Sequence, residues 1–475
     1  MALVLAAAPA LAAPRPPVNL LPPPAPVPAA TPVPVTTPAP VSTPATKPVP
    51  APAATAPATI PAAPASGAAG QPAPQIVPLP PVPVVEPVQH WTLADAQALL
   101  ATIMDIGSDG LIPADYKPDA LRATMAAGEG AALDELASKS FSWLVEDMRD
   151  GRTPMDARVQ WFAVDPDQDA HPTAAIMAEA LATHDISGTV ASLAPKHPDY
   201  AALKAALAKT PAADTKGRAL IRANMDRWRW LAQDLGVLYL MTNVPEFQLR
   251  LTANDRIIRT YRTVVGKPGR TATPQLAEHV EAVVFNPTWT VPQSIVVGEG
   301  LGARLAGNPA AAARQGYKVT KAADGTITVV QQPGDSNSLG RMKIDMPNPH
   351  AIYLHDTPAK ALFNAPSRAF SHGCVRTERA VELGMTMAIL GADLKPEDGV
   401  AYATSLKYTR VKMTKTFPVY IAYFTVAQDI TGKLTTFADI YGRDAPVLAS
   451  FEKPRELKTA QRTSSEAIIK LDNPL

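Results

Sequence analysis

The residues with the clearest chemical potential form the run SHGCVR, residues 371–376, and Cys374 within it is the only cysteine among 475 residues. A histidine, His355, stands 19 positions upstream. A lone thiol cannot form an intramolecular disulfide, and neighbouring imidazole and guanidinium groups favour its thiolate form. The sequence therefore predicts that Cys374 is a nucleophile.

Two other roles for this cysteine are less favoured. A free cysteine is often a small buried apolar residue, but Cys374 stands among histidines and an arginine. Zinc binding by His355, His372 and Cys374 is disfavoured, because structural zinc sites take more thiolates and catalytic ones show a paired-ligand helix. We expect no metal. A papain-like or NlpC-type peptidase places its cysteine ahead of its histidine, whereas here His355 comes first.

The N-terminal segment predicts export. Residues 1–12 are small and apolar and end in an A-x-A type cleavage site, although a charged n-region is missing, so we interpret them as a truncated signal peptide. About 11 residues are too few to span a bilayer, and no other long apolar run occurs. We expect a periplasmic or envelope protein without a transmembrane segment. An unpaired thiol in an oxidising compartment is usually functional.

Composition separates a tether from the folded part. Residues 13–88 hold 26 of the 51 prolines and only three charged side chains, which predicts a disordered, polyproline-like segment. Such a sequence is equally typical of a plain disordered tail and of a spacer that reaches through a porous layer. The net charge of +1 argues against nucleic acid as a partner. Residues 451–475 are expected to form a C-terminal tail.

Residues 89–235 predict a helical scaffold domain. Apolar side chains recur at helical spacing in three stretches, the first capped by Thr92 and the second ended by Gly151. The third stripe consists of Ile221, Met225, Trp228, Leu231 and Leu235.

Residues 236–450 predict a mostly antiparallel β domain, so the fold class is α+β. Short β-branched or aromatic runs at 237–240, 247–251, 257–261 and 280–285 read as strands, and residues 254–255 supply hairpin turn chemistry. We expect one helix after the cysteine motif, starting near Thr377. Cys374 would then lie just ahead of a helix N-terminus, which stabilises a thiolate and offers amides for an oxyanion hole.

Alternation along residues 351–355 orients the histidine. Ile352 and Leu354 should face the core, while Tyr353 and His355 share the opposite face. His355 is therefore expected to project from a strand end into a cleft.

The motifs together resemble the L,D-transpeptidase (YkuD-type) family, in its large, scaffold-bearing YcbB-like branch. The resemblance covers roughly residues 90–460 and includes His355 and the SHGCVR run. Further motifs that carry it are IRANMDRWRW (221–230), VGKP (265–268), FNPTW (285–289), LGRMK (339–343), PNP (347–349) and YLHDTP (353–358).

The resemblance implies an acyl transfer on peptidoglycan stem peptides. Cys374 would attack the carbonyl of the third residue of a tetrapeptide, usually meso-diaminopimelate, and an amine from a neighbouring stem would resolve the thioester to give a 3→3 cross-link. His355 would be general base and acid, and the amides of Gly373 and Cys374 would hold the oxyanion. No cofactor is implied, and carbapenem-type inhibitors are expected.

The same resemblance suggests roles for further residues. His372 and Ser371 would shape the site, and Tyr353 and Trp289 would line the cleft, with wall packing favoured for Trp289. Arg376 would hold a substrate carboxylate or the motif loop, or else form a structural ion pair.

Two segments and several activities complete the expectations. Residues 293–339 are expected to form a mobile cap, the alternative being a plain surface excursion. The small peptidoglycan-binding domain common in this branch has no counterpart between 165 and 216. An L,D-carboxypeptidase, a transferase that anchors a protein to the wall, and a non-catalytic cell-wall scaffold stay open.

Overall fold

The structure, a computed structural model, describes residues 88–163 and 171–456. The expected signal segment 1–12, nearly all of the tether and the tail from residue 457 lie outside the described residues. None of the described helices is long and apolar enough to cross a membrane.

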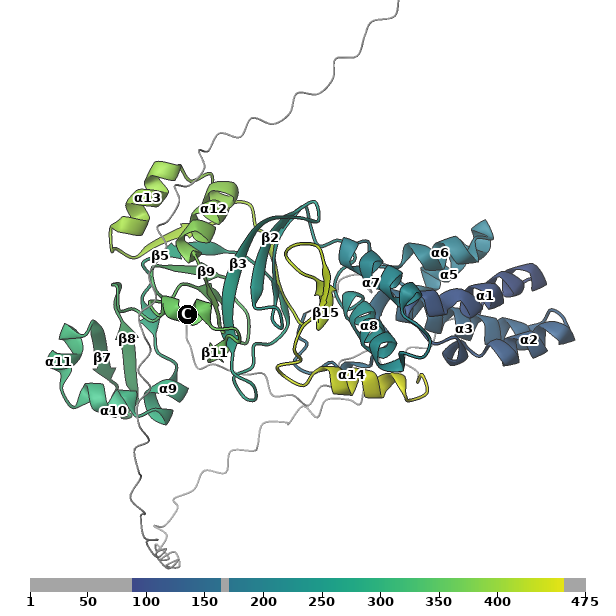
Figure 1. Ribbon diagram of the computed structural model, residues 1–475, viewed down its shortest axis with the longest axis horizontal. Helices are drawn as coiled ribbons and strands as arrows, with labels where there is room; N and C mark the ends of the chain where they lie inside the picture. The colour runs from purple at the N-terminus through teal and green to yellow at the C-terminus, as the bar shows by residue number, and fades with distance from the viewer. Residues whose placement is uncertain (1–87, 164–170, 457–475) are drawn as a thin grey trace, which may run out of the picture. The chain divides into compact units, whose positions relative to one another are not determined.

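The described residues between Leu93 and Trp228 are mostly helical, as the periodicity predicts (Figure 1). Its helices are α1 (Leu93–Asp105), α2 (Pro118–Ala127), α3 (Ala131–Asp150), α5 (Thr173–Thr183), α6 (Ile186–Ser192), α7 (Pro198–Lys209) and α8 (Thr215–Trp228), with 3-10 turns η1 (Ile106–Asp109), η2 (Pro113–Tyr116) and η3 (Met155–Ala157). The Thr92 hydroxyl accepts the Asp95 N–H at 3.1 Å, so the expected cap is present. Gly151, at φ 86°, ends α3.

The third apolar stripe extends beyond its helix. Helix α8 ends at Trp228, so the expected continuation through Leu231 and Leu235 is wrong, although both side chains are buried. Leu231 and Leu235 lie in irregular chain after the helix, but their side chains pack in the same apolar cluster as Trp228. Buried residues of irregular chain can therefore have the same spacing as the apolar residues of a helix.

A mixed but mostly antiparallel sheet follows the helices. Its strands are β1 (Leu238–Asn243), β2 (Gln248–Ala253), β3 (Arg256–Gly266), β4 (Leu276–His279), β5 (Ala282–Phe285), β9 (Met342–Asp345), β10 (Leu354–His355), β11 (Ala369–Ser371), β12 (Val375–Thr377), β13 (Thr409–Lys412) and β14 (Pro418–Ala422). The order is β13-β5-β9-β10-β12-β3-β2-β1-β14-β4, with β11 also paired to β3. The α+β fold class is confirmed.

Local chemistry explains the hairpin and the helices that follow the cysteine. Asn254 and Asp255 have φ of 48° and 57°, the conformation that a two-residue β2–β3 turn requires. The expectation of one helix after the motif is wrong, since α12 (Ala380–Ala392) is followed by α13 (Pro396–Thr404) and α14 (Asp444–Phe451). Helix α13 carries its own start signals, a proline at its first position and Glu397 and Asp398 in its first turn.

The sheet is covered by helices on both sides. Helix α12 packs closely on one face, where a Cβ added to Gly384 would stand 2.6 Å from Met342. Helix α8 packs against β1 and β14 through a separate apolar cluster, in which Trp228 stacks on Phe424 at 4.5 Å. A two-stranded ribbon, β15 (Val426–Gln428) with β16 (Leu434–Thr436), lies next to α7 and α8.

The segment between β5 and β9 folds around a core of its own. It contains β6 (Trp289–Thr290), α9 (Gln293–Gly298), α10 (Leu301–Ala306), α11 (Pro309–Arg314), β7 (Tyr317–Lys321) and β8 (Ile327–Gln331). The strands form a small sheet in the order β6-β8-β7, and Figure 1 draws these elements as one group. Val291, Val296, Leu305, Ala312 and Val329 make a closed apolar cluster, so this segment is more than an irregular surface loop.

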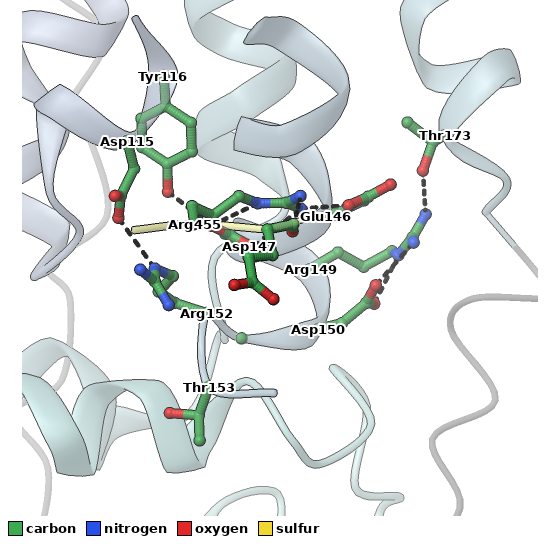
Figure 2. A network of polar contacts seen from close by, with 12 residues as sticks. Asp115, Tyr116, Glu146, Asp147, Arg149, Asp150, Arg152, Thr153, Thr173 and Arg455 are labelled. Atoms are coloured by element: carbon green, nitrogen blue, oxygen red, sulfur yellow. Dashed lines mark hydrogen bonds and ion pairs between the residues drawn. The ribbon is translucent and has the colours of Figure 1, made fainter. Parts of the chain in front are cut away.

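Buried charges fasten the C-terminal end of the described chain to α3, as Figure 2 shows. The Arg455 guanidinium, 2% exposed, pairs with Glu146 and lies 3.3 Å from Asp147. Arg152 binds Asp115 at 2.9 Å and donates to the Ser450 carbonyl at 3.2 Å. The bonds from Arg455 to Glu146 and from Arg152 to Ser450 join residues about 300 positions apart in the chain.

Replacement of Arg455 should destabilise the fold strongly. Arg455→Met leaves the carboxylates of Glu146 and Asp147 buried without their cation, which costs about 3–5 kcal/mol. Urea unfolding followed by tryptophan fluorescence will measure the loss. Lys453→Gln, which removes an exposed charge from the same segment, should stay within about 0.5 kcal/mol of the parent protein. Equal midpoints for the two variants would contradict this account of the network.

Candidate active site

Strand register brings the predicted site residues together. In the parallel pair β10–β12 His355 is opposite Arg376, and in the antiparallel pair β9–β10 it is opposite Lys343. Directly opposed residues point to the same face of a sheet. Lys343, His355 and Arg376 therefore form one row across three strands.

A second row lies two residues away on the same face. Side chains alternate along a strand, so Asp345, Tyr353 and Cys374 share the face of the first row. The Tyr353 and His355 rings are 5.5 Å apart, as the expected shared face requires. Ile352 and Leu354 are buried in the core beneath, as expected. The sheet thus places Cys374 beside Tyr353, and His355 one step along the same face.

The position of Cys374 relative to the helix differs from expectation. Cys374 precedes strand β12, whereas α12 begins only at Ala380. The prediction that the thiol lies at a helix N-terminus is therefore wrong, because residues 375–377 pair with β10 and β3 before the helix starts. The helix dipole gives Cys374 no close support, since its effect falls off within one turn.

His355 is held as a neutral imidazole of one tautomer. Its Nδ1 lies 2.5 Å from the Asp356 carbonyl oxygen, which can only accept, so Nδ1 carries the proton of the neutral ring. Burial, followed by the positive charge of Arg376, lowers the pKa of His355 to about 3. Near neutral pH the imidazole is therefore uncharged.

Cys374 rests as a thiol. Burial raises its pKa above the ordinary value, although donation from the Tyr353 main chain, the charge of Lys343, the Tyr353 hydroxyl and Arg376 all act to lower it. The side chain is half-buried, and Sγ lies 3.7 Å from the Ala351 carbonyl. The expectation that its neighbours favour the thiolate is wrong for this structure, because desolvation outweighs them.

The loop around Cys374 is fixed by hydroxyl groups. The Ser371 hydroxyl donates to the Cys374 carbonyl at 2.6 Å and accepts the Gly373 N–H at 3.1 Å. The expected use of the Gly373 amide for an oxyanion conflicts with this bond. No hydrogen bond of the Cys374 N–H is found in the part of the chain that the structure describes. Gly373 has φ 123°, a conformation that other residues rarely adopt.

Trp289, Tyr353 and Arg376 lie near Cys374 and His355. Trp289 donates to the Tyr353 hydroxyl, and burial and the Cys374 charge raise the Tyr353 pKa, so this hydroxyl stays a donor. Among the described residues Arg376 has no carboxylate partner, and its buried Nε has no hydrogen bond. A structural ion pair is thus not what holds Arg376.

His372 connects the motif to the segment between β5 and β9. Its Nε2 lies 3.2 Å from the Glu299 carboxylate, which follows α9. The side chain of His372 is 47% exposed and that of Glu299 57%, so this contact stands open to solvent. Sequence reasoning missed Glu299, since nothing local in its sequence distinguishes it.

Thr273 is a second residue that sequence reasoning missed. Its hydroxyl donates to the Gly373 carbonyl at 2.7 Å and accepts the Gly266 N–H at 2.8 Å. Thr273 therefore ties the motif loop to the end of β3. Its role depends on contacts across 100 residues, which no local pattern reveals.

An open pocket of about 290 Å³ lies beside Tyr353 and Lys343 on this face. Tyr353 and Trp289, both predicted to line a cleft, are in its wall. The other lining residues are Glu281, Val284, Pro287, Thr288, Thr290, Leu339, Lys343, Asp345, Pro347, Tyr408 and Arg410. Among the described residues no group of three or more histidine, cysteine or acidic side chains is arranged to hold a metal ion.

Comparison with known proteins finds family matches in two parts of the chain. Residues 238–385 match the L,D-transpeptidase catalytic domain, YkuD, and residues 89–207 match a scaffold domain. A protein of Haemophilus influenzae assigned as an L,D-transpeptidase is 29% identical over 224 residues, 44% of this chain and 45% of that protein. The match therefore spans about half the length of this curated relative.

Solved structures similar to this chain include an L,D-transpeptidase from Mycobacterium smegmatis, at 12% identity over 39% of this chain and 58% of that one, with a TM-score of 0.20. Another is L,D-transpeptidase 3 from Mycobacterium tuberculosis with a faropenem-derived adduct, at 12% identity, 39% and 60% coverage and a TM-score of 0.21. Residues 238–385 are thus similar to an L,D-transpeptidase catalytic domain and residues 89–207 to a scaffold domain.

The resting protonation state can be tested by alkylation. Because burial raises the Cys374 pKa and lowers that of His355, the iodoacetamide rate should rise with pH to a midpoint above that of free glutathione, without a step near pH 6.5. Tyr353→Phe removes a donor to sulfur and should move the midpoint higher. Mass spectrometry of the intact protein over time will measure the alkylation rate at a single site, since Cys374 is the only cysteine. A reactive plateau from about pH 4 to 8 would instead indicate a thiolate–imidazolium pair.

Proposed function

We propose that this protein is a peptidoglycan L,D-transpeptidase that forms 3→3 cross-links between stem peptides through a thioester on Cys374. The observation that carries the proposal is the placement of Cys374, Tyr353 and His355 on one face of β10 and β12, within the matched catalytic domain. The substrate places the enzyme in the cell envelope, in the periplasm.

In the acylation step a neutral pair becomes a thioester. His355 Nε2 takes the thiol proton while Sγ of Cys374 attacks the carbonyl carbon of the third residue. The Cys374 N–H and the Tyr353 hydroxyl are the donors aimed at the negative oxygen that develops. When the tetrahedral intermediate collapses, the C–N bond breaks and His355 returns its proton to the departing D-alanine amine.

The second step determines the product. His355 removes a proton from the side-chain amine of a neighbouring stem, which attacks the thioester and releases the Cys374 thiol. Water in place of the amine would give an L,D-carboxypeptidase, and an amine on a protein would give a wall anchor. A non-catalytic scaffold would not need a fixed His355 tautomer.

The other predicted residues take supporting roles in this scheme. Arg376 holds a substrate carboxylate, which is consistent with its lack of an acidic partner among the described residues. Ser371 and His372 shape the motif loop, and Trp289 supports the Tyr353 hydroxyl and the cleft wall.

The segment 293–339 serves as a cap over the transfer reaction. Its own apolar core lets it move as a unit, and at its base the Asn337 side chain donates to the Pro287 carbonyl at 3.0 Å. The contact between Glu299 and His372 holds this segment against the motif loop. A closed cap keeps water from the thioester and favours the amine.

Loss of this contact should change the products. Glu299→Gln removes a solvent-exposed pair worth at most about 1 kcal/mol, so the ratio of hydrolysed tripeptide to cross-linked dimer should rise by about two- to fivefold. Chromatography with mass spectrometry will give the ratio. Asp324→Asn, an exposed acidic position elsewhere in the cap, serves as the control. If Glu299→Gln leaves the ratio unchanged, the cap does not determine whether the amine or water attacks the thioester.

The activity itself is tested on defined substrates. Purified protein incubated with disaccharide tetrapeptides should yield 3→3 dimers and free D-alanine, and Cys374→Ala should yield neither. His355→Ala should lower acylation by about 10²–10⁴-fold, because the thiol then lacks its base. Intact mass should also detect a carbapenem adduct on Cys374, since a strained lactam carbonyl accepts the same attack. Tripeptides alone would favour the carboxypeptidase, and no product with no adduct would favour the scaffold.

A further inference from the structure

The pocket next to Tyr353 contains charges that the transfer chemistry does not use. Lys343 and Asp345 on β9 line it together with Arg410 on β13 and Glu281, which precedes β5. Two positive and two negative side chains therefore surround the same space of about 290 Å³.

The four charges form a connected set. Asp345 lies 2.8 Å from the Lys343 ammonium and 3.2 Å from Arg410 Nε, and Arg410 also lies 3.8 Å from Glu281. Lys343 and Asp345 are 13% and 14% exposed, whereas Arg410 is 36% exposed and Glu281 55%. The Lys343 ammonium also lies 4.4 Å from the centre of the Tyr353 ring. The Lys343–Asp345 end of the set is thus shielded beside Tyr353, and the Arg410–Glu281 end is open to solvent.

Register fixes how far this set lies from the nucleophile. Asp345 belongs to the row of Tyr353 and Cys374 and is two strands away from the sulfur, about 10 Å at the usual strand spacing. On β13, Arg410 is opposite Val284 of β5, and Val284 is opposite Lys343 of β9. Arg410 therefore starts two strands away from β9, and its guanidinium extends back across β5 to Asp345.

A pocket with two positive and two negative side chains favours a ligand that carries both charges. A group that carries both an ammonium and a carboxylate can place the carboxylate on Arg410 and Lys343 and the ammonium on Asp345 and Glu281. A lysine side chain offers only the ammonium and would leave the cations of the pocket without a new partner. Six covalent bonds separate the reacting carbonyl carbon of a diaminopimelate residue from its distal carboxyl carbon, on the order of 7–8 Å in an extended side chain. Hydrogen bonds of about 3 Å complete the span.

We propose that Lys343, Asp345, Arg410 and Glu281 form a subsite for the zwitterionic end of a diamino-dicarboxylic acid side chain, at the third position of the donor peptide. Binding of this side chain in the subsite positions the reacting carbonyl of the donor peptide over Cys374. This inference rests on the proposed function for the identity of the donor, but its binding step can be measured without turnover.

Binding to a full-length Cys374→Ala protein tests the subsite directly. Calorimetry should give tighter binding of a tetrapeptide with meso-diaminopimelate than of the same peptide with lysine. Arg410→Gln in that background should weaken the diaminopimelate peptide by about tenfold and change the lysine peptide by less than twofold. Amidation of the distal carboxylate of the peptide should weaken its binding to the Cys374→Ala protein by the same factor of about ten. The same amidation should not weaken binding further when Arg410→Gln is also present.

A matched control removes charge without touching the pocket. Lys412 is two residues after Arg410, on the same face of β13, but it does not line the pocket. Lys412→Gln should therefore leave the affinities for the diaminopimelate and lysine peptides unchanged. Thermal unfolding of each variant will show that the fold is intact. Equal affinity for the two peptides, no measurable binding of either, or equal loss for both in Arg410→Gln would overturn the subsite.

The two proposals fail in different ways. Selective binding without release of D-alanine by the parent protein would leave the subsite standing and overturn the transpeptidase. Release of D-alanine at equal rates from both peptides, with binding unaffected by Arg410→Gln, would overturn the subsite and leave the transpeptidase standing.

Discussion

The arrangement of the candidate site residues depends on the main-chain pairing of β10 with β12. Two short strands in parallel register set His355 opposite Arg376, and the Val375 N–H bonded to the Tyr353 carbonyl at 3.1 Å extends that register to Cys374. A slip of one residue would turn the thiol to the core face and its neighbour Val375 to the site. The chemistry therefore requires that everything around these strands hold one register.

The rest of the molecule supplies that rigidity through buried polar contacts as well as apolar packing. Asn224 on α8 bonds to Thr425 beyond β14, and Arg227 pairs with Asp444 at 2.6 Å. Asp226, fully buried on the same helix, accepts the N–H groups of Arg152 and Thr153. These contacts explain physically why the run at 221–230 has such an unusual mixture of charge and tryptophan.

Sequence periodicity predicted the elements better than their junctions. The helical half, the hairpin at Asn254 and the shared face of Tyr353 and His355 follow from local rules that the structure obeys. The start of α12 could not be derived locally, because residues 375–377 favour either state and are drawn into the sheet by β3 and β10. The state of the thiol was predicted wrongly for a related reason, since sequence reveals neighbouring charges but not desolvation. Glu299, Thr273 and the charges on β9 and β13 reach the site only through long-range packing.

The protonation states and the proposed substrate contacts bear on one another. An imidazole with a pKa near 3 is a weak base, and the best general base has a pKa near the working pH. Burial lowers this pKa most, and the positive charge of Arg376 is the next cause. A substrate carboxylate bound to Arg376 would cancel that second contribution and raise the His355 pKa only when a donor peptide is present. The base would then be strengthened at the moment when the carbonyl is in place, and the empty site would keep its only thiol protonated and slow to react with other electrophiles.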